Sequence, residues 1–249
     1  MRILKNEKLT PDVFVLTILD KRIATTARPG QFVSVRVTYP IRGGQSYFPL
    51  LRRPLSVHSV EGDTFKLLYK VVGEGTSILS TYRDGDELDI IGPLGNSFTT
   101  YDSKNVLIVA GGMGVAPLYF LASRYHSHNS ITTLIGAKTK DEVLCEEEFT
   151  KLGKAMVTTE DGSYGVKGRV TDLLTSFHPE IIFSCGPPGM LSVVKLYART
   201  HFIPCQMSLE CHLACGIGVC LGCAIPVKPG YKYVCKDGPV FWGDEIETF

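Results

Sequence analysis

The chain has 249 residues, of which 44% are hydrophobic and 20% are charged, and its formal net charge is +1. This length allows two domains and a small appendage, whereas a nearly neutral charge offers no attraction to nucleic acid or to an anionic membrane surface. Segment 1–8 is interrupted by charges, and the longest uncharged stretch, 106–123, contains glycines and a proline, so we expect neither a signal peptide nor a membrane span. Eight cysteines without a leader indicate the cytoplasm.

Residues 1–100 are predicted to form short strands separated by turns. Apolar runs rich in Val, Ile, Leu and Phe occupy 13–19, 32–37, 55–60, 65–72 and 87–91. Turn residues lie between them at 28–30, 43–44 and 84–86. Evenly spaced strands of this kind predict an antiparallel β-barrel or sandwich.

The pattern changes near residue 102, and we assign 101–204 to a second domain. Buried strands are predicted at 105–110, 131–135 and 181–184, and helices follow them, one of them at 141–152. Strands that alternate with helices predict a doubly wound parallel sheet.

The last segment, 205–249, is predicted to be a small module that carries a metal centre. Cys215, Cys220 and Cys223 are spaced as C-x4-C-x2-C, and Cys235 follows. This is the ligand spacing of a plant-type [2Fe–2S] loop. Glycines 216, 218 and 222 allow the backbone to take positive φ angles and to direct N–H groups at sulfur.

Four cysteines can also bind zinc or form disulfides. A four-thiolate zinc site usually has two C-x2-C pairs, and only one such pair is present here. A disulfide framework is typical of small secreted domains, which this chain does not resemble in size. Cys211 stands three residues before Cys215 and competes as a ligand, and we treat it as a flanking thiol.

Glycine-rich loops after two strands of the second domain predict a nucleotide site. Gly111-Gly112-Met-Gly114 and Cys185-Gly186-Pro187 each follow a predicted strand. Ligands bind at the carboxyl ends of such strands, although close helix–strand packing also requires small residues there. In the first domain, Arg53-Pro-Leu-Ser56 and the later segment Gly73–Ser77 are suited to binding a pyrophosphate.

The order of these motifs resembles the ferredoxin–NADP reductase superfamily and, more narrowly, the electron-transfer subunits of class 1B dihydroorotate dehydrogenases. Segments 215–223 and 234–241 are the most specific pieces, and the resemblance extends over essentially the whole chain. It implies a flavin-binding barrel, a nicotinamide-binding α/β domain and a [2Fe–2S] module.

The resemblance also implies the site residues. The FAD site would contain Arg53, Pro54, Leu55, Ser56, Leu68, Tyr69, Lys70, Gly75 and Thr76. The NAD(H) site would contain Gly111, Gly112, Gly114, Gly186 and Pro187, and Cys185 and Glu210 would be the catalytic residues at the nicotinamide–flavin contact. The superfamily usually has an aromatic residue in place of Leu55, so this chain departs from the pattern there. A buried apolar thiol is the alternative interpretation of Cys185.

Nicotinamide specificity is predicted from the loops after the second and third strands. An arginine that would bind a 2′-phosphate is missing after 131–135, where only Lys138 occurs. Glu160 or Asp161 is suited to accepting a hydrogen bond from a free ribose 2′-OH. We therefore expect NADH rather than NADPH.

The activity that the resemblance implies is electron transfer without acid–base catalysis. Electrons would pass between NAD(H), FAD, the [2Fe–2S] cluster and the FMN of a dihydroorotate dehydrogenase catalytic subunit, in a heterotetramer with two copies of each chain and in pyrimidine biosynthesis. One alternative is an NAD(P)H-dependent reductase that supplies another acceptor, such as ferredoxin. A second is a non-catalytic module that binds zinc and a regulatory nucleotide.

Overall fold

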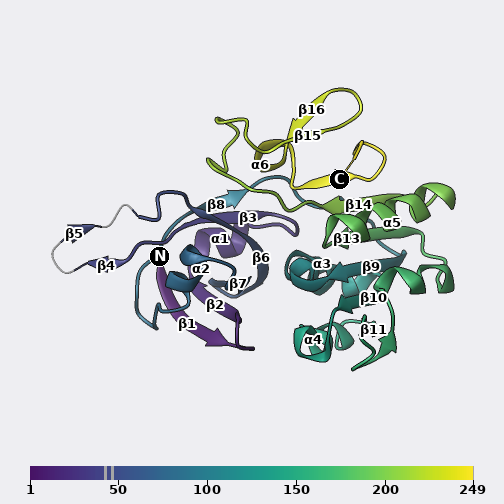
Figure 1. Cartoon of the computed structure of the whole chain (residues 1–249), viewed down its shortest axis with the longest axis horizontal. Helices are drawn as coiled ribbons and strands as arrows, with labels where there is room; N and C mark the ends of the chain where they lie inside the picture. The colour runs from purple at the N-terminus through teal and green to yellow at the C-terminus, as the bar shows by residue number, and fades with distance from the viewer. Residues whose placement is uncertain (42–43, 46–47, 249) are drawn as a thin grey trace.

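The computed structural model describes residues 1–41, 44–45 and 48–248, and it has two large sheets with a small C-terminal module beside both (Figure 1). Gly43, in one predicted turn, lies outside the described residues. No helix in the described part of the chain has the length and apolar character needed to cross a bilayer.

The N-terminal sheet has six antiparallel strands in the order β1-β2-β7-β6-β3-β8. The strands are β1 (Arg2–Lys8), β2 (Val13–Leu19), β3 (Phe32–Arg36), β6 (Arg53–Glu61), β7 (Thr64–Lys70) and β8 (Asp89–Leu94). The sheet also carries α1 (Lys21–Thr26), α2 (Glu74–Leu79) and a hairpin of β4 (Pro40–Ile41) and β5 (Gly44–Gln45). The five predicted strands are confirmed. β1 was missed because Ile3 is its one buried side chain.

The two edges of this sheet meet, so the sheet closes into a barrel. The N-terminal amino group and the amide of Ile3 donate to the carbonyls of Leu88 and Asp86, at 2.7 and 2.8 Å. The amide of Leu88 returns a bond to the carbonyl of Met1 at 2.8 Å. These bonds satisfy backbone groups that an open edge would leave unpaired. The antiparallel barrel predicted for this region is confirmed.

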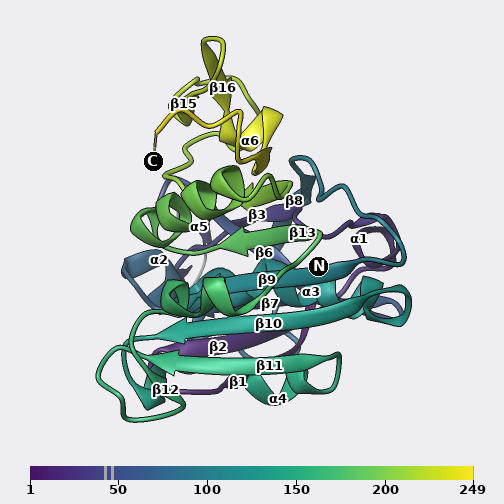
Figure 2. The same cartoon turned by 90° about the vertical axis from the view of Figure 1, so that its right-hand side faces the viewer.

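The second sheet has the order β12-β11-β10-β9-β13-β14-β17, and its first six strands are parallel. Figure 2 shows β12 to β13 of this sheet side by side. The strands are β9 (Asn105–Gly111), β10 (Ser130–Ala137), β11 (Lys154–Thr159), β12 (Val166–Lys167), β13 (Ile181–Cys185), β14 (Cys205–Ser208) and β17 (Val240–Trp242). The helical segments are η1 (Gly112–Gly114), α3 (Val115–Tyr125), η2 (His126–His128), η3 (Lys140–Glu142), α4 (Glu146–Thr150), η4 (Val170–Ser176) and α5 (Pro188–Thr200).

Both faces of this sheet are covered. In β9, Ile108 packs in the core beneath α3, whereas Leu107 and Val109 pack in the core beneath α5 and η4. A strand buried on both faces reads as a continuous apolar run, which is why the sequence predicts β9 well. The doubly wound sheet is confirmed.

The predicted helix at 141–152 is wrong in its extent. Val143 is extended, Cys145 has a left-handed φ of +61°, and α4 begins only at Glu146. A left-handed residue stops propagation of a right-handed helix. The apolar spacing that predicted one helix over 141–152 therefore belongs to two shorter elements, η3 and α4.

The C-terminal segment contributes to two structural units. β14 and β17 belong to the large sheet, and β17 runs antiparallel to β14. Between them lie the thiol-bearing loop, a hairpin of β15 (Ala224–Pro226) and β16 (Tyr231–Tyr233), and α6 (Val234–Asp237). We keep three domains as a proposal, and the pairing of β14 with β13 favours a boundary after residue 208 over one after residue 204.

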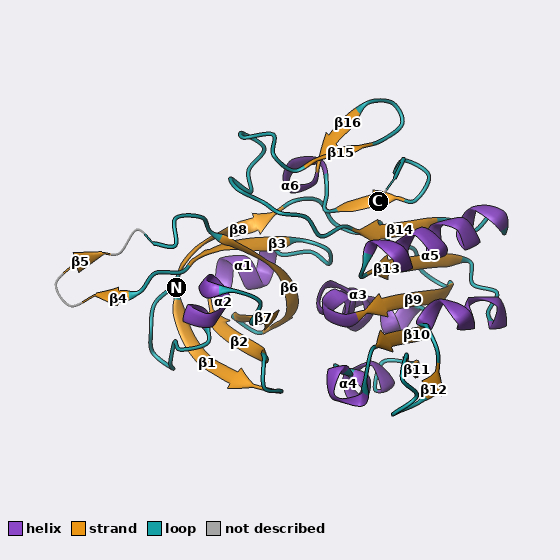
Figure 3. Ribbon diagram, viewed as in Figure 1, coloured by secondary structure: helices purple, strands orange, loops and turns teal. Residues whose placement is uncertain are grey.

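Helix α3 joins the barrel to the parallel sheet (Figure 3). Phe120 belongs to α3, but its side chain is fully buried in the core of the barrel and not in that of the parallel sheet. His58 of β6 is buried against α3, where its Nδ1 lies 3.1 Å from the carbonyl oxygen of Ala116 and its ring stacks on Tyr119. Burial lowers the pKa of His58 from 6.5 to about 4.

We expect this interface to weaken in mild acid. Because the pKa of His58 is lower in the folded chain than in the unfolded chain, stability is retained above pH 6.5 and is lost as the pH falls from 6.5 toward 4. The loss at pH 5.5 should be about 1.4 kcal/mol, one tenfold step in the unfolding equilibrium. Urea unfolding at pH 7.5 and 5.5 measures it. His58→Gln keeps a donor for Ala116 but cannot titrate, and an unchanged pH dependence in this variant would contradict the assignment.

Candidate functional site

The loop of residues 215–223, called the thiol loop below, directs backbone amides at the sulfur of Cys215. The N–H groups of Ile217, Val219 and Cys220 donate to its Sγ at 3.5, 3.3 and 3.4 Å. Gly216 and Gly218 take positive φ angles of +70° and +80°, as predicted, which lets the loop wrap around the sulfur. The prediction for Gly222 is wrong, because Leu221 carries the third positive φ, +62°.

The second pair of thiols is buried. Cys223 Sγ lies 3.3 Å from Cys235 Sγ, the amide of Cys235 donates to Cys223 Sγ at 3.4 Å, and Gly218 N–H donates to Cys235 Sγ at 3.1 Å. Cys220 is exposed, and its thiol interacts with that of Cys215. The four cysteines therefore form two adjoining pairs.

The chemistry of these thiols fits a [2Fe–2S] cluster. Amides of Cys220 and Ile217 lower the pKa of Cys215 to about 6, which favours the thiolate that binds iron. Burial, and then the neighbouring Cys223, raises the pKa of Cys235 to about 12, a cost that a bound cation would remove. Among the residues described, no three candidate ligands are arranged around one metal ion. Two pairs of thiols fit two irons better than a single zinc ion.

Cys211 lies beside this centre. It is half-buried, and burial together with the nearby Cys223 raises its pKa to about 11. The assignment of Cys211 as a flanking thiol stays a prediction.

The thiol loop packs against the barrel next to the predicted flavin motif. A Cβ placed on Gly216 would lie 3.6 Å from Ser34 Oγ and 4.0 Å from the ring of Phe32, both on β3. Ser34 and Phe32 pair with Pro54 and Ser56 of β6. Adjacent strands lie about 4.8 Å apart, so only one strand separates the loop from the Arg53–Ser56 motif.

Arg53 and Gly75 are in direct contact. The guanidinium of Arg53 lies where a Cβ on Gly75 would stand, and it donates to the carbonyl of Leu51. Thr76 Oγ1 accepts the amides of Val72 and Gly73, at 2.9 and 3.3 Å, and this fixes the turn before α2. A positive charge therefore lies beside the first turn of α2, an arrangement that suits a pyrophosphate.

Three other predicted flavin residues, Leu55, Leu68 and Tyr69, pack their side chains into the protein. Leu55 packs against the barrel core, and Leu68 packs in the core under α3. Tyr69 is buried, stacks on Phe14, and donates to Asn6 Oδ1 at 3.1 Å. Any contact that Leu68 and Tyr69 make with FAD must therefore use main-chain groups.

Lys70 links the two domains. Its Nζ lies 3.1 Å from Asp12 Oδ2 and 3.9 Å from Glu142 Oε1, so it pairs with a carboxylate on each side of the interface. Its role in the FAD site stays a prediction.

The glycine-rich loops surround a cavity of about 350 Å³ at the carboxyl ends of the parallel strands. It is lined by Gly111, Gly112, Gly136, Ala137, Lys138, Glu142, Glu160, Arg169, Val170, Thr171, Pro187, Gly189, Met190 and Val193. Gly114 and Gly186 are next to lining residues in the chain but do not themselves line the cavity. A Cβ on Gly114 would overlap the carbonyl of Cys185, and one on Gly186 would lie 2.6 Å from Met190 Cε. Packing against the backbone therefore requires glycine at 114, whereas at 186 the methionine end can move and the φ of +156° is what favours glycine.

The cavity distinguishes between the two acidic candidates. Glu160 lines it, whereas the carboxylate of Asp161 accepts the amide and hydroxyl of Ser163 at 2.9 and 2.7 Å. Arg169 was missed, because it comes after the short strand β12 and no motif marks it.

Cys185 and Glu210 lie close enough to interact. Cys185 has no exposed surface, and burial, followed by the charge of Glu210, raises its pKa well above the usual value. Glu210 is exposed, yet protein atoms around its carboxyl group raise its pKa by desolvation. A neutral thiol is a poor nucleophile but can donate a hydrogen bond. Their catalytic roles stay predictions.

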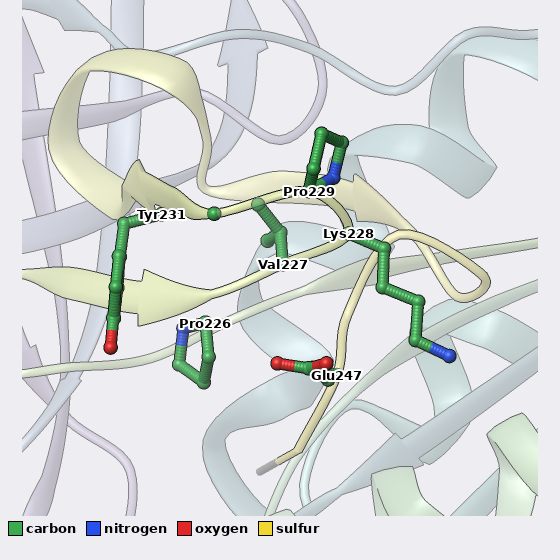
Figure 4. Close-up of a pocket in the computed structure, with 7 residues that line it drawn as sticks. Pro226, Val227, Lys228, Pro229, Tyr231 and Glu247 are labelled. Atoms are coloured by element: carbon green, nitrogen blue, oxygen red, sulfur yellow. The ribbon is translucent and has the colours of Figure 1, made fainter.

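A larger cavity of about 570 Å³ lies at the β15–β16 hairpin (Figure 4). It is lined by Pro226, Val227, Lys228, Pro229, Gly230, Tyr231 and Glu247. None of these is a predicted cofactor residue, so the size of this cavity does not mark the redox site.

Family models match two parts of the chain. One, described as the iron-sulfur cluster binding domain of dihydroorotate dehydrogenase B, matches residues 210–247. The other, an oxidoreductase NAD-binding domain, matches residues 108–195.

The chain is also similar to whole proteins and to solved structures. It is 40% identical to the dihydroorotate dehydrogenase B (NAD(+)) electron transfer subunit of Caldanaerobacter subterraneus subsp. tengcongensis, over 98% of this chain and 96% of that relative. The Streptococcus pneumoniae protein of the same name is 36% identical over 97% and 95%. A structure of an NADH-dependent reduced ferredoxin-NADP oxidoreductase has a TM-score of 0.87 and 35% identity, and it covers 99% of this chain and 89% of that one.

A more distant structure has the same fold. The cytochrome b5 reductase domain of Ulva prolifera nitrate reductase has a TM-score of 0.62 and 19% identity, over 77% of this chain and 87% of that one. The extent and identity of the closer matches establish the family. The chain belongs to the dihydroorotate dehydrogenase B (NAD(+)) electron transfer subunits, within the ferredoxin–NADP reductase fold.

Proposed function

We propose that this chain carries electrons between the FMN of a dihydroorotate dehydrogenase catalytic subunit and NAD in pyrimidine biosynthesis, through its own [2Fe–2S] cluster and FAD. The observation that carries this proposal is the packing of the thiol loop on β3, beside the strand that bears Arg53 and Ser56. When bound, FAD supplies the conversion between the two-electron hydride of NADH and the single electrons that a cluster accepts.

The protein's own residues bind and position these groups. Arg53 would hold the pyrophosphate, Cys215, Cys220, Cys223 and Cys235 would hold the irons, and the cavity beside Gly111 and Pro187 would hold the nicotinamide nucleotide. No side chain has to act as a nucleophile or a base, so the protein contributes geometry and electrostatics. The reduced thiols suit a cytoplasmic location.

The surface around Cys220 is suited to the partner subunit. Ile217, Val219 and Leu221 are apolar and are 54%, 72% and 51% exposed. Exposed apolar groups clustered on one loop mark a protein contact more often than a free surface. The proposed partner is the FMN-containing catalytic subunit, in a heterotetramer with two copies of each chain.

The decisive experiment is anaerobic co-expression of this chain with such a catalytic subunit. We expect a stable complex that contains iron, sulfide, FAD and FMN and that forms NADH from NAD⁺ and dihydroorotate. A complex that lacks iron and sulfide, or one in which dihydroorotate oxidation never reaches NAD⁺, would refute the proposal.

A reductase that supplies another acceptor is the second candidate. The 0.87 TM-score to the NADH-dependent reduced ferredoxin-NADP oxidoreductase favours it. Failure of the chain to bind the catalytic subunit, together with rapid reduction of ferredoxin by NADH, would select this alternative.

Glu160 is expected to set the preference for NADH over NADPH. Its carboxylate in the cavity would repel a 2′-phosphate, and Glu160→Gln should raise the NADPH-to-NADH ratio of kcat/KM about tenfold, equivalent to about 1.4 kcal/mol. Asp161→Asn is the matched control, because Asp161 is bound to Ser163, and it should leave the ratio unchanged. A parent protein that prefers NADPH would contradict this assignment.

A further inference from the structure

Asn96, in the loop after β8, makes four hydrogen bonds to the segment that follows the last cluster ligand. Its Nδ2 donates to the carbonyls of Asp237 and Val240 at 3.0 and 2.7 Å. Its Oδ1 accepts the amide of Val240 at 2.9 Å, and its own amide donates to the carbonyl of Gly238 at 2.6 Å. One half-buried side chain thus satisfies three backbone groups of a segment more than 140 positions away in the sequence.

Segment 237–240 connects the cluster centre to the rest of the molecule. Cys235 lies two residues before it in α6, and Val240 begins β17, which pairs with β14 of the parallel sheet. On the barrel side the approach is close. A Cβ on Gly95 would lie 2.6 Å from the carbonyl oxygen of Gly238 and 2.7 Å from Pro239 Cδ. The barrel, the thiol centre and the parallel sheet therefore meet at Asn96.

We propose that Asn96 is a positioning residue for electron transfer. It fixes the distance and orientation of the cluster module, residues 209–239 between β14 and β17, relative to the flavin barrel. This inference rests on the proposed function. The rate of single-electron transfer from reduced FAD to the oxidised cluster falls steeply as the distance between the two groups increases. Phe32 and Leu94 pack against the cysteines of the module but set no register, whereas the directional bonds of Asn96 fix where segment 237–240 lies on the barrel.

The test is Asn96→Asp, which keeps the size of the side chain. A carboxylate would face the carbonyl oxygens of Asp237 and Val240, which need a donor, and repulsion would replace two hydrogen bonds. Asn96→Ala removes these two bonds and also the acceptor of the Val240 amide, without new charge, and is the second variant.

Asn6 provides a matched control inside the barrel. Its Nδ2 donates to the carbonyls of Leu79 and Tyr82, both at 3.0 Å, and its Oδ1 accepts the Tyr69 hydroxyl at 3.1 Å. It is half-buried, like Asn96, and makes the same number of side-chain bonds. Asn6→Asp therefore reproduces the chemical change without touching the cluster module.

The experiment follows two rates after anaerobic mixing with NADH, in protein loaded with FAD and cluster. In Asn96→Asp, FAD reduction should stay within about twofold of the parent, whereas cluster reduction should slow at least tenfold, equivalent to about 1.4 kcal/mol in the barrier. Asn6→Asp should slow neither step. Hydrogen exchange at the Val240 amide, measured without NADH, should rise in Asn96→Ala, which removes the acceptor of that amide, and should not rise in Asn6→Asp.

Two results would overturn the inference. One is cluster reduction at the parental rate in both Asn96 variants, although the Val240 amide exchanges freely in Asn96→Ala. The other is equal slowing in the Asn6 and Asn96 variants, which would indicate general loosening. A parent that binds neither FAD nor iron would instead refute the proposed function on which the inference rests, and that result is read from the parent alone.

Discussion

Replacement of Cys235 by serine is expected to remove the cluster and to abolish electron transfer between the partner subunit and NAD. Cys235 is buried, contacts Cys223 Sγ at 3.3 Å and receives the amide of Gly218, so no neighbouring thiol can take its place without rearranging the loop. Iron and sulfide should fall to background. NADH oxidation with a dye that accepts electrons from FAD should continue, because Arg53 and the nucleotide cavity are untouched.

Cys211→Ser is the control for the ligand set. Cys211 is the nearby thiol that the spacing leaves as a competitor, and it lies close enough to Cys223 to interact with it. This variant should keep iron, sulfide and activity with dihydroorotate. Loss of the cluster in Cys211→Ser, with retention in Cys235→Ser, would show that the ligands are assigned incorrectly.

Replacement of Gly75 by alanine is expected to weaken FAD binding without weakening the fold. The new Cβ would occupy the place of the Arg53 guanidinium, which stands at the end of a flexible side chain and can move away. Alanine is also favoured over glycine within α2. Loss of one charge-assisted contact to the pyrophosphate, worth about 1.5–3 kcal/mol, would raise the FAD dissociation constant roughly 10- to 100-fold. Titration of the apoprotein with FAD, monitored by flavin fluorescence, measures this.

Two further variants make this result specific. Arg53→Ala should lose a similar amount of FAD affinity, and combining it with Gly75→Ala should add little, because both remove the same contact. Gly73→Ala, two residues earlier, places a Cβ where nothing lies within 4 Å and keeps an extended backbone, so FAD affinity should not change. Additive losses in the double variant would contradict a shared mechanism.

Side-chain alternation and apolar runs predicted most of the strands, because the buried positions of a strand are apolar and a short stretch of sequence shows them. β9 is apolar throughout since both of its faces are covered, and β2 was predicted with its observed bounds. The failures occurred where local sequence carries no such constraint. β1 has one buried residue, and a single left-handed residue, Cys145, shortened the predicted helix.

The site residues, too, were predicted where a local pattern marks them and missed where it does not. Thiol spacing indicated Cys215, Cys220, Cys223 and Cys235, and the structure brings them together in two pairs. The resemblance named Tyr69, whose side chain lies inside the barrel, and sequence reasoning missed Arg169, which only folding brings to the nucleotide cavity.

By itself, the sequence determined which chemical groups this protein can use, because ligand spacing and glycine positions act over a few residues. Tertiary structure alone decided how those groups are placed relative to one another. Asn96 and segment 237–240 are far apart in the chain yet hydrogen-bonded, and Gly216 and Ser34 are far apart in the chain yet lie close together. Such contacts depend on the packing of whole domains, which no local pattern encodes, and they set the distances on which electron transfer depends.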